Sequence, residues 1–392
     1  MNNKKNKKGK FNILHIDAFK NFGGAQNDIV ILLKFMKLYR SEEFNIFVIH
    51  NNNERLRDEL DKCGICNFSV RMTNFMDIFA LLKIRRFLKR YDIDLINFHS
   101  SLDHFLSGIA AVSIFKKKII KVLTRHVAYK VDFLKGFLIY KFLTDRFIVI
   151  SDFIKKRLIN DIGIDESLIR TIYSPRICGD ENKAASFYES EKAEIRKEFG
   201  IKPDEKMISI IGRLSGEKGH EVFIKAAELI IKKRRDLKFV IIGEGELHDY
   251  IVGLIKTKGL KDNFVISGFK ENIEKFIYAS DLITVPSGIE GMGSIIIESC
   301  ALKKAVIASD VGGIPEIIKN NETGLLFKNG DFFELAEKIM YLIDKYDLIE
   351  NFAVNCYNKV VKKFDAKAVT LQTAEFYLEL LNGVNKKNKK DY

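Results

Sequence analysis

The chain has 392 residues, of which 47% are hydrophobic and 30% are charged, a balance typical of a soluble globular protein with more than one domain. No run of about 18 apolar residues is present, which argues against a membrane-spanning helix, and no apolar signal segment follows the basic N-terminus, which argues against secretion. The net charge is +13, and all of the excess lies in residues 1–180, which hold 32 Lys and Arg against 19 Asp and Glu.

Cysteine number and charge distribution bear on the compartment and the partners. Five cysteines are scattered along the chain, an odd number that, without a secretory signal, predicts reduced thiols in a cytoplasmic protein. The one-sided positive charge indicates an anionic partner, such as a membrane surface, an acidic lipid or nucleic acid. The lysine-rich ends, 1–10 and 384–392, are predicted to be disordered tails.

Apolar β-branched runs alternate with helical patterns along the chain. In the first half, strands are predicted at 11–16, 44–49, 95–98, 119–123 and 146–150, and helices at 27–37, 77–90, 103–114 and 151–160. In the second half, strands are predicted at 206–211, 238–242, 263–266, 282–285 and 305–308, and helices at 220–232, 247–258, 273–279, 293–300 and 314–319. Near-continuous apolar strands separated by helices are typical of parallel sheets covered on both faces. The sequence therefore predicts two α/β domains.

The domain boundary is predicted in a polar stretch without periodicity. We expect an N-terminal domain over 11–178, a linker over 179–194 and a C-terminal domain over 195–365. Ligands of parallel sheets bind at the carboxyl ends of the strands. With two facing domains, the expected site is the cleft that both of them line.

The stretch 290–298 holds two carboxylates around a glycine-rich turn. Glycine lets backbone amides approach a ligand closely. Ionised carboxylates such as Glu290 and Glu298 only accept hydrogen bonds, which suits a ligand with many hydroxyl groups. By itself such a pair of glutamates is weak evidence, so its surroundings decide its meaning.

Glycines follow five predicted strands of the second half. After the first of these strands, the loop that starts at Gly212 carries Arg213 and Lys218, the residue types that grip phosphate. Further glycines follow the next strands, at Gly243 and Gly268 and in the loops that begin near 286 and 310. Because parallel strands end at one edge of their sheet, this edge is predicted to hold a nucleotide and its sugar.

Taken together, these motifs resemble those of family 4 glycosyltransferases, which have the GT-B fold. The resemblance rests on GRLSGEKG at 212–219, IIGEGE at 241–246, PSGIEGMGSIIIES at 286–299, DVGGIPE at 310–316 and the Gly-Leu-Leu at 324–326. The first half resembles the family less closely, through FGGAQ at 22–26, HSS at 99–101, TRH at 124–126 and Ser151 after a strand. The resemblance implies two Rossmann-like parallel-sheet domains facing across a cleft, with a C-terminal helix over 366–383 that packs back on the first domain.

The resemblance further implies a retaining hexosyltransferase that takes its sugar from a nucleoside-diphosphate donor, UDP rather than GDP. Arg213 and Lys218 would hold the diphosphate and stabilise the leaving group in place of a metal ion, so that no metal and no other cofactor is expected. Glu290 would bind the donor sugar and Glu298 the ribose. His126 would lie near the reacting sugar.

Further contacts are implied by the same motifs. The donor contacts are Gly23, Gly24, Gly212, Gly243, Gly268, Phe269, Lys270, Gly291, Met292, Gly293, Ser294 and Ile295. His99 and Ser100 are the candidate acceptor residues. A histidine that follows a strand, such as His126 or His99, is often a structural hydrogen-bonding group, and that alternative stays open. A metal site on His99 and His104 is rejected, because only Asp103 is near enough in sequence to complete it.

The acceptor is expected to be a glycan or a lipid-linked glycan, in the synthesis of cell-envelope polysaccharide or lipopolysaccharide. Helix 81–90 is basic and amphipathic, with Arg85, Arg86, Lys89 and Arg90, and apolar residues with flanking cations recur over 131–147. Such segments lie on anionic membranes, although an apolar helix face can equally belong to the core. We therefore expect a cytoplasmic protein at the inner face of the membrane. The alternatives are a nucleotide-sugar epimerase or other GT-B enzyme, and a basic nucleic-acid-binding protein, for which no binding motif is found.

Overall fold

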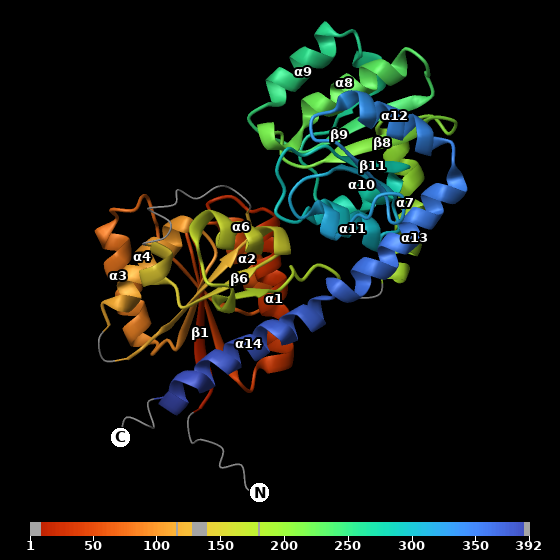
Figure 1. Ribbon diagram of the computed structural model, residues 1–392. Coiled ribbons are helices and arrows are strands. Elements are labelled where there is room, and N and C mark those ends of the chain that lie inside the picture. The colour runs from red at the N-terminus through yellow and green to blue at the C-terminus, as the bar shows by residue number, and fades with distance from the viewer. Residues whose placement is uncertain (1–8, 115–116, 128–138, 179–180, 388–392) are drawn as a thin grey trace, which may run out of the picture. The chain divides into compact units, whose positions relative to one another are not determined.

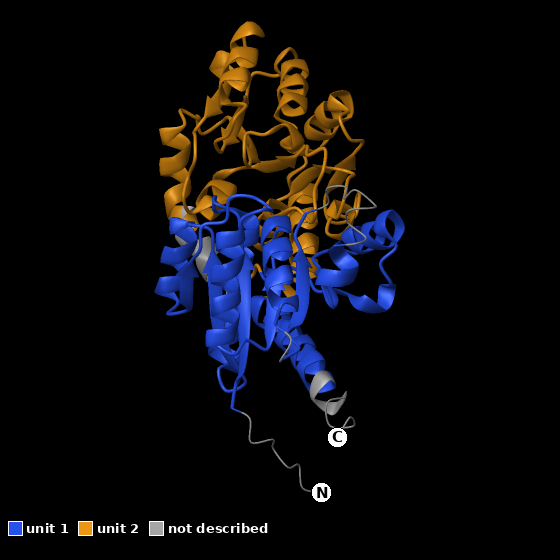
Figure 2. Ribbon diagram, turned by 90° about the vertical axis from the view of Figure 1, so that its left-hand side faces the viewer, with its two compact units in different colours: residues 1–175, 366–392 blue, residues 176–365 orange. Residues whose placement is uncertain are grey.

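The computed structural model describes residues 9–114, 117–127, 139–178 and 181–387. The chain divides into two compact units, coloured separately in Figure 2. Unit 1 comprises residues 1–175 and 366–392, and unit 2 comprises residues 176–365. Most of the predicted N-terminal tail and residues 131–138 of the apolar segment 131–147 lie outside the described residues.

Unit 1 is built on a sheet of seven parallel strands (Figure 1). The strands are β1 (Phe11–Asp17), β2 (Phe44–His50), β3 (Cys66–Ser69), β4 (Leu95–Phe98), β5 (Ile120–Arg125), β6 (Arg146–Val149) and β7 (Ile169–Thr171). They pair in the order β3-β2-β1-β4-β5-β6-β7. The chain first winds outward from β1 through β2 to β3 and then returns to β4 on the other side of β1. The loops after β1 and β4 therefore lead away in opposite directions. Ligands of such sheets bind in the crevice between two loops of this kind.

Helices cover this sheet. They are α1 (Gly24–Arg40), α2 (Glu54–Lys62), α3 (Ile78–Arg90), α4 (Ser101–Val112), α6 (Asp152–Ile162) and α14 (Ala366–Lys387), with the short turn η1 (Glu166–Leu168). Helices α1, α2 and α14 share one hydrophobic core with the strands, in which Leu33, Leu60 and Tyr377 are fully buried. Helix α14 lies beside α1 (Figure 1), so the end of the chain completes the first unit.

Unit 2 repeats the plan with six parallel strands in the order β10-β9-β8-β11-β12-β13. The strands are β8 (Lys206–Ile211), β9 (Leu237–Ile242), β10 (Phe264–Ile266), β11 (Leu282–Val285), β12 (Val306–Ser309) and β13 (Leu325–Phe327). The helices are α7 (Glu181–Glu198), α8 (His220–Ile231), α9 (His248–Thr257), α10 (Ile273–Ala279), α11 (Ser294–Ala301), α12 (Phe332–Ile343) and α13 (Tyr346–Lys363), and the turns are η2 (Gly216–Lys218), η3 (Lys261–Asn263) and η4 (Ile314–Glu316). In this sheet the chain runs outward from β8 through β9 to β10, and then returns to the other side of β8, where β11, β12 and β13 follow.

The strand sequences explain the layered architecture. All four residues of β4, β11 and β12 are buried, as expected for parallel strands with helices on both faces. Polar side chains start the helices: Ser100, Ser151 and Asp77 each accept a hydrogen bond from a backbone N–H in the first turn of α4, α6 and α3. The predicted pair of parallel α/β sheets is confirmed.

The predicted linker and the predicted helix at 314–319 are corrected by the structure. Helix α7 occupies most of the predicted linker 179–194 and packs against α10. Buried apolar residues are found beyond the end of the predicted linker, at Ile195 in the last turn of α7 and at Phe199 just after the helix. At the predicted helix 314–319 the structure has only the turn η4. The strands β3, β7 and β13 were not predicted, because β3 (CNFS) and β7 (IRT) are half or more polar and β13 (LLF) has only three residues.

The cysteines and the C-terminus also differ from the prediction. Cys300 on α11 and Cys356 on α13 form a disulfide across 56 residues of sequence, a pairing that scattered spacings do not reveal. Cys63, Cys66 and Cys178 take no part in a disulfide. Helix α14 continues to Lys387, into the segment predicted as a tail. Among the described residues, no helix combines the length and the apolar character that a membrane crossing needs.

Candidate active site

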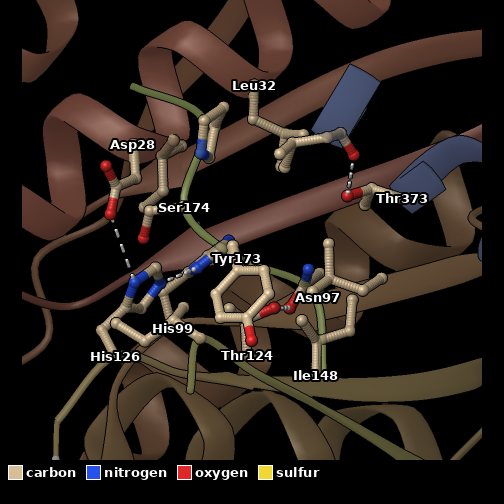
Figure 3. Close-up of a pocket in the computed structure, with 15 residues that line it drawn as sticks. Asp28, Leu32, Asn97, His99, Thr124, His126, Ile148, Tyr173, Ser174 and Thr373 are labelled. Atoms are coloured by element: carbon tan, nitrogen blue, oxygen red, sulfur yellow. Dashed lines mark hydrogen bonds and ion pairs between the residues drawn. The ribbon is translucent and has the colours of Figure 1, made fainter. Parts of the chain in front are cut away.

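Three histidines from neighbouring strands of unit 1 form a hydrogen-bonded chain. Nδ1 of His15 lies 2.9 Å from Nε2 of His99, and Nδ1 of His99 lies 3.0 Å from Nε2 of His126. Asp28 on α1 lies beside the end of the chain, with its Oδ2 3.8 Å from Nδ1 of His126, an ion-pair distance beyond hydrogen-bond reach (Figure 3). The predicted catalytic residue His126 and the predicted acceptor residue His99 are therefore direct neighbours.

The register of the sheet brings these side chains together. His15 of β1 lies opposite Asn97 of β4, and Phe98 of β4 lies opposite Leu123 of β5. His99 follows the end of β4 and His126 follows the end of β5, so both stand at the same carboxyl edge of the sheet, as expected for a ligand site.

Burial keeps His15 and His99 uncharged near neutral pH. Burial lowers the pKa of His15 to about 3, and burial together with the neighbouring His15 and His126 lowers the pKa of His99 well below its usual range. A neutral imidazole donates from one nitrogen and accepts at the other. The Asp28 carboxylate favours the proton on Nδ1 of His126, which leaves Nε2 to accept from His99. The chain can thus fix which nitrogen of His126 carries the proton.

Two buried carboxyl groups anchor the loops around these histidines. Oδ2 of Asp103 accepts from the backbone N–H of Ala18 at 2.9 Å, and Oδ1 accepts from that of His99 at 3.2 Å. Burial raises the pKa of Asp17 to about 6. Burial, and then the charge of Asp17, raise the pKa of Asp103 well above its usual range. These carboxyls hold the loops after β1 and β4 in place.

Ser100, Gly23 and Gly24 lie at helix N-termini of unit 1. Ser100 is the N-cap of α4, and its hydroxyl donates to Asp103. Gly23 is the N-cap of α1, and its N–H donates to Oε1 of Gln26 at 2.9 Å. Gly24 begins that helix. Ser100 therefore stabilises α4, and its contact with an acceptor stays a prediction.

A small cavity lies beside the histidine chain, wholly within unit 1. Its volume is about 30 Å³, room for one or two water molecules and not for a sugar. Thr124 donates to Oδ1 of Asn97 at 2.9 Å, and the Asn97 amide donates to the Tyr377 hydroxyl at 2.5 Å. Residues labelled around it in Figure 3 include Leu32, Asn97, Thr124, Ile148, Tyr173, Ser174 and Thr373.

In unit 2, the loops at the carboxyl ends of the strands pack against one another at glycines. A Cβ on Gly243 would lie 1.9 Å from the carbonyl oxygen of Gly212, and a Cβ on Gly312 would lie 1.8 Å from that of Glu290. No side chain fits at such distances, and Gly312 also has a φ of +59°. The loops after β8, β9, β11 and β12 therefore join into one connected edge.

Lys218 and Glu290 meet at this edge. Lys218 ends the turn after β8, and Glu290 follows the neighbouring strand β11. Nζ of Lys218 lies 2.5 Å from Oε1 of Glu290, and the Ser287 hydroxyl donates to the same oxygen at 3.0 Å. Arg213 is exposed in the same loop as Lys218. A cation and a carboxylate predicted for the diphosphate and the sugar thus lie in direct contact.

Glu298 lies on α11, one turn beyond its N-terminus. Oε1 of Glu298 accepts from Nη1 of Arg176 at 2.9 Å. Gly293 is the N-cap of α11 and has a φ of +83°, a conformation suited to glycine. The Met292 side chain is buried, so in the stretch 291–295 it is the backbone of Met292, and not its side chain, that a ligand would meet.

Phe269 and Lys270 follow β10 and differ in exposure. The Phe269 ring is 51% exposed, as a surface for stacking on a base requires. Nζ of Lys270 lies 2.7 Å from Oε1 of Glu198 and 5.7 Å from the centre of the Phe199 ring. Lys270 therefore contacts α7, and its contact with a nucleotide base stays a prediction. Gly268 has a φ of +70°.

Sequence reasoning missed His15, Asp28 and Arg176. His15 is a polar residue inside an otherwise apolar strand, a signal that a buried polar contact was needed. Asp28 and Arg176 offered no such signal, because their partners lie 98 and 122 residues away in sequence. Within the described ranges, no three His, Cys, Asp or Glu side chains are grouped so as to hold a metal ion.

Two family profiles match the two halves of the chain. The one described as "Glycosyltransferase Family 4" matches residues 28–175, and the one described as "Glycosyl transferases group 1" matches residues 191–359. The chain belongs to the family 4 glycosyltransferases. The predicted family is therefore confirmed, and the less similar first half is included in it.

Three comparisons illustrate the relationship. The alpha-D-kanosaminyltransferase of Streptomyces kanamyceticus is 31% identical over 194 residues. The match covers 49% of this chain and only 50% of that relative's length. The UDP-Gal:alpha-D-GlcNAc-diphosphoundecaprenol alpha-1,3-galactosyltransferase of Escherichia coli is 25% identical over 96% of this chain and 98% of its own. Anabaena Alr3699/HepE, solved in complex with UDP and glucose, matches with a TM-score of 0.81 and 20% identity over 94% of this chain and 100% of its own. This family 4 glycosyltransferase thus has the predicted GT-B fold.

Proposed function

We propose that the protein transfers a sugar from a nucleoside-diphosphate sugar to a glycan or glycolipid acceptor, with retention of the anomeric configuration. The observation that carries this proposal is the contact of Lys218 with Glu290 at the glycine-packed edge of unit 2. A cation for the diphosphate and a carboxylate for the sugar hydroxyls are needed side by side, because the sugar is bonded to the phosphate in the donor.

The charges at this edge suggest how the transfer is assisted. Lys218, with Arg213 in the same loop, stabilises the negative charge that grows on the diphosphate as the sugar departs. Glu290 accepts hydrogen bonds from the sugar hydroxyls and orients the ring. The acceptor hydroxyl attacks the anomeric carbon of the sugar from the face on which the diphosphate departs. The leaving phosphate takes the proton of that hydroxyl. In this proposal the two cations serve in place of a metal ion, and no cofactor is needed.

The test is the release of nucleoside diphosphate by three variants, Glu290→Gln, Lys218→Ala and Arg213→Ala. We expect the turnover of each to fall by about 100-fold or more, the effect of removing one preorganised charge or donor. Lys225→Ala is the matched control, because Lys225 pairs with Glu221 on the exposed face of α8. Wild-type turnover in the three variants would contradict the proposal. Loss of wild-type activity in a chelator, restored by Mg²⁺, would contradict metal independence alone.

For the donor we propose UDP rather than GDP, and for the acceptor a lipid-linked glycan of the cell envelope. Support comes from HepE, which was solved with UDP, and from the galactosyltransferase relative, which is named for a diphosphoundecaprenol-linked acceptor. A thermal-shift panel of nucleotide sugars separates the donors, because a ligand well above its dissociation constant raises the unfolding midpoint. Conversion of the donor sugar without transfer would instead favour an epimerase.

We also propose peripheral association with an anionic membrane surface through α3 of unit 1. Its inner face is core, because Ala80, Ile84 and Leu88 are buried. On its outer face Ile78 and Phe79 are 63% and 81% exposed. The exposed cations of the helix are Lys83, Arg86, Lys89 and Arg90. Apolar residues flanked by cations are suited to the boundary of headgroups and acyl chains.

A further inference from the structure

The carboxylate of Glu298 is paired with Arg176, the first residue of unit 2, which lies 122 residues earlier in the sequence. The Arg176 side chain is only 4% exposed and that of Glu298 is 15% exposed, with 2.9 Å between Nη1 and Oε1. A guanidinium is permanently charged and presents its donors in a rigid plane. It therefore holds the carboxylate in one orientation far more firmly than water would.

Arg176 is itself fixed by the backbone around it. The N–H groups of Arg176 and Ile177 both donate to the carbonyl oxygen of Phe364, each at 3.0 Å. Ile177 also bridges to Asp365. The stretch in which the chain enters unit 2 is thus bonded to the stretch in which it leaves, and Arg176 projects from that junction onto α11.

Helix α11 is held from a second side as well. The disulfide of Cys300 with Cys356 joins α11 to α13. Glu298 lies two residues before Cys300, so its helix is connected both to the entry stretch and to α13. Such double attachment suits a side chain whose position must be reproduced closely.

We propose that Arg176 is a positioning residue of the donor site, which orients Glu298 for the ribose of the nucleotide. The inference rests on the proposed function and on the role that the sequence motifs predict for Glu298, binding of the ribose. Nη1 of Arg176 donates to Oε1 of the carboxylate, and the ribose hydroxyls donate to the lone pairs of the same carboxylate group that the oriented side chain presents to them. Arg176 does not touch the donor itself.

A second arginine pair in unit 2 provides a matched control. Nη1 of Arg196 lies 2.9 Å from Oδ2 of Asp281, with 13% of the arginine side chain exposed. Asp281 immediately precedes β11, so this pair lies at the amino edge of the sheet, away from the proposed donor loops. Loss of either pair removes a partly buried ion pair, but only loss of Arg176 alters Glu298.

The experiment measures the dissociation constants of UDP and of 2′,3′-dideoxyUDP by calorimetry, for the wild type and for Arg176→Met, Arg176→Lys, Glu298→Gln and Arg196→Met. We expect Arg176→Met to weaken UDP binding about tenfold, the worth of one charge-assisted hydrogen bond. Arg176→Lys should lie between the wild type and Arg176→Met, because lysine keeps the charge and loses the planar fork. The dideoxy nucleotide, which lacks both hydroxyls, should bind wild type and Arg176→Met equally. Arg196→Met should keep wild-type affinity for UDP while its unfolding midpoint falls.

Two results would overturn the inference while the donor site stands. One is wild-type UDP affinity in Arg176→Met and Arg176→Lys while Glu298→Gln is weakened. The other is an equal loss for UDP and for the dideoxy nucleotide, which would mean that Arg176 acts on the fold or on the phosphates. If Arg176→Met fails to fold, Arg176→Lys decides between these outcomes. A wild type that binds neither UDP nor GDP would instead refute the proposed function.

Discussion

Buried histidines make the stability of this protein depend on pH. Burial lowers the pKa of His104 to about 4, from an ordinary value of 6.5, and Nε2 of His104 is bonded to the Thr144 hydroxyl at 2.8 Å. Between these two pKa values the unfolded chain binds a proton that the folded chain does not. The free energy of unfolding therefore falls as the pH is lowered from about 6.5 to about 4.

We predict that His104→Gln removes part of this pH dependence. The wild type should lose about 2 kcal/mol from this one group between pH 7 and pH 5, and the variant should not, because glutamine does not titrate. Urea unfolding at both pH values measures the difference. His248→Gln is the control, since the His248 side chain is 51% exposed. An identical fall in the wild type and in His104→Gln would show that this histidine is not the source.

At the scale of residues, the sequence points to candidate chemistry only where a residue type and its place after a strand agree. His126, Lys218 and Glu290 meet this condition, and their roles stay predictions. Whether His99 bonds to His126, and Glu290 to Lys218, depends on which strands are neighbours, and strand order is not readable from the periodicity of one sequence. Arg176 escaped notice because its environment is made by residues at the other end of unit 2.

At the scale of elements, the donor loops are held together by backbone contacts at glycines. Gly312 and Gly330 both have positive φ, +59° and +78°. A Cβ on Gly312 would strike the carbonyl oxygen of Glu290 at 1.8 Å, whereas a Cβ on Gly330 would meet no atom within 4 Å. Backbone strain is common to substitutions at both positions, whereas the steric contact between loops arises only at Gly312. Comparing the two substitutions therefore separates these effects.

We predict different outcomes for Gly312→Ala and Gly330→Ala. The second should cost about 1–2 kcal/mol, the strain of a left-handed alanine, and should leave the turnover unchanged. The first should cost more and lower the turnover at least tenfold, because the Glu290 loop must move away. Thermal unfolding midpoints and the release of nucleoside diphosphate check both effects. Equal losses in the two variants would mean that the contact between the loops carries no function.

The elements themselves were largely predictable, and the exceptions have physical causes. Long apolar runs such as β8 and β9 were recognised from composition. Helix α7 was read as a linker because its sequence is polar over most of its length and it gains its place by packing on α10. Propensity alone is a weak guide to such a helix, whose stability comes from tertiary contacts.

At the scale of the whole molecule, the positive charge belongs to one unit. Unit 1 has 36 Lys and Arg against 21 Asp and Glu, whereas unit 2 has 29 against 31. Exposed apolar side chains lie just before and within the first turns of α3, on the positively charged unit, at Phe75, Met76, Ile78, Phe79 and Leu82. Charge and apolar exposure thus coincide on the same unit, which is the combination that an anionic bilayer attracts.

We predict that vesicles containing anionic phosphatidylglycerol bind the protein and that vesicles of phosphatidylcholine alone bind it weakly. Neutralising Arg86, Lys89 and Arg90 should weaken binding about 100-fold, since each cation near the surface contributes about 1 kcal/mol. Arg85 is omitted because its Nε is bonded to the Ser113 hydroxyl at 2.8 Å. Cosedimentation measures the bound fraction.

The apolar contribution is separated by a second pair of variants. Phe79→Ser should weaken binding to the anionic vesicles, whereas Phe333→Ser on α12 of unit 2, where the ring is 60% exposed, should not. Salt should reduce the electrostatic part of the binding and leave the part due to Phe79. Equal binding by all variants, or salt-dependent binding to duplex DNA in place of vesicles, would show that the positive charge of unit 1 serves another partner.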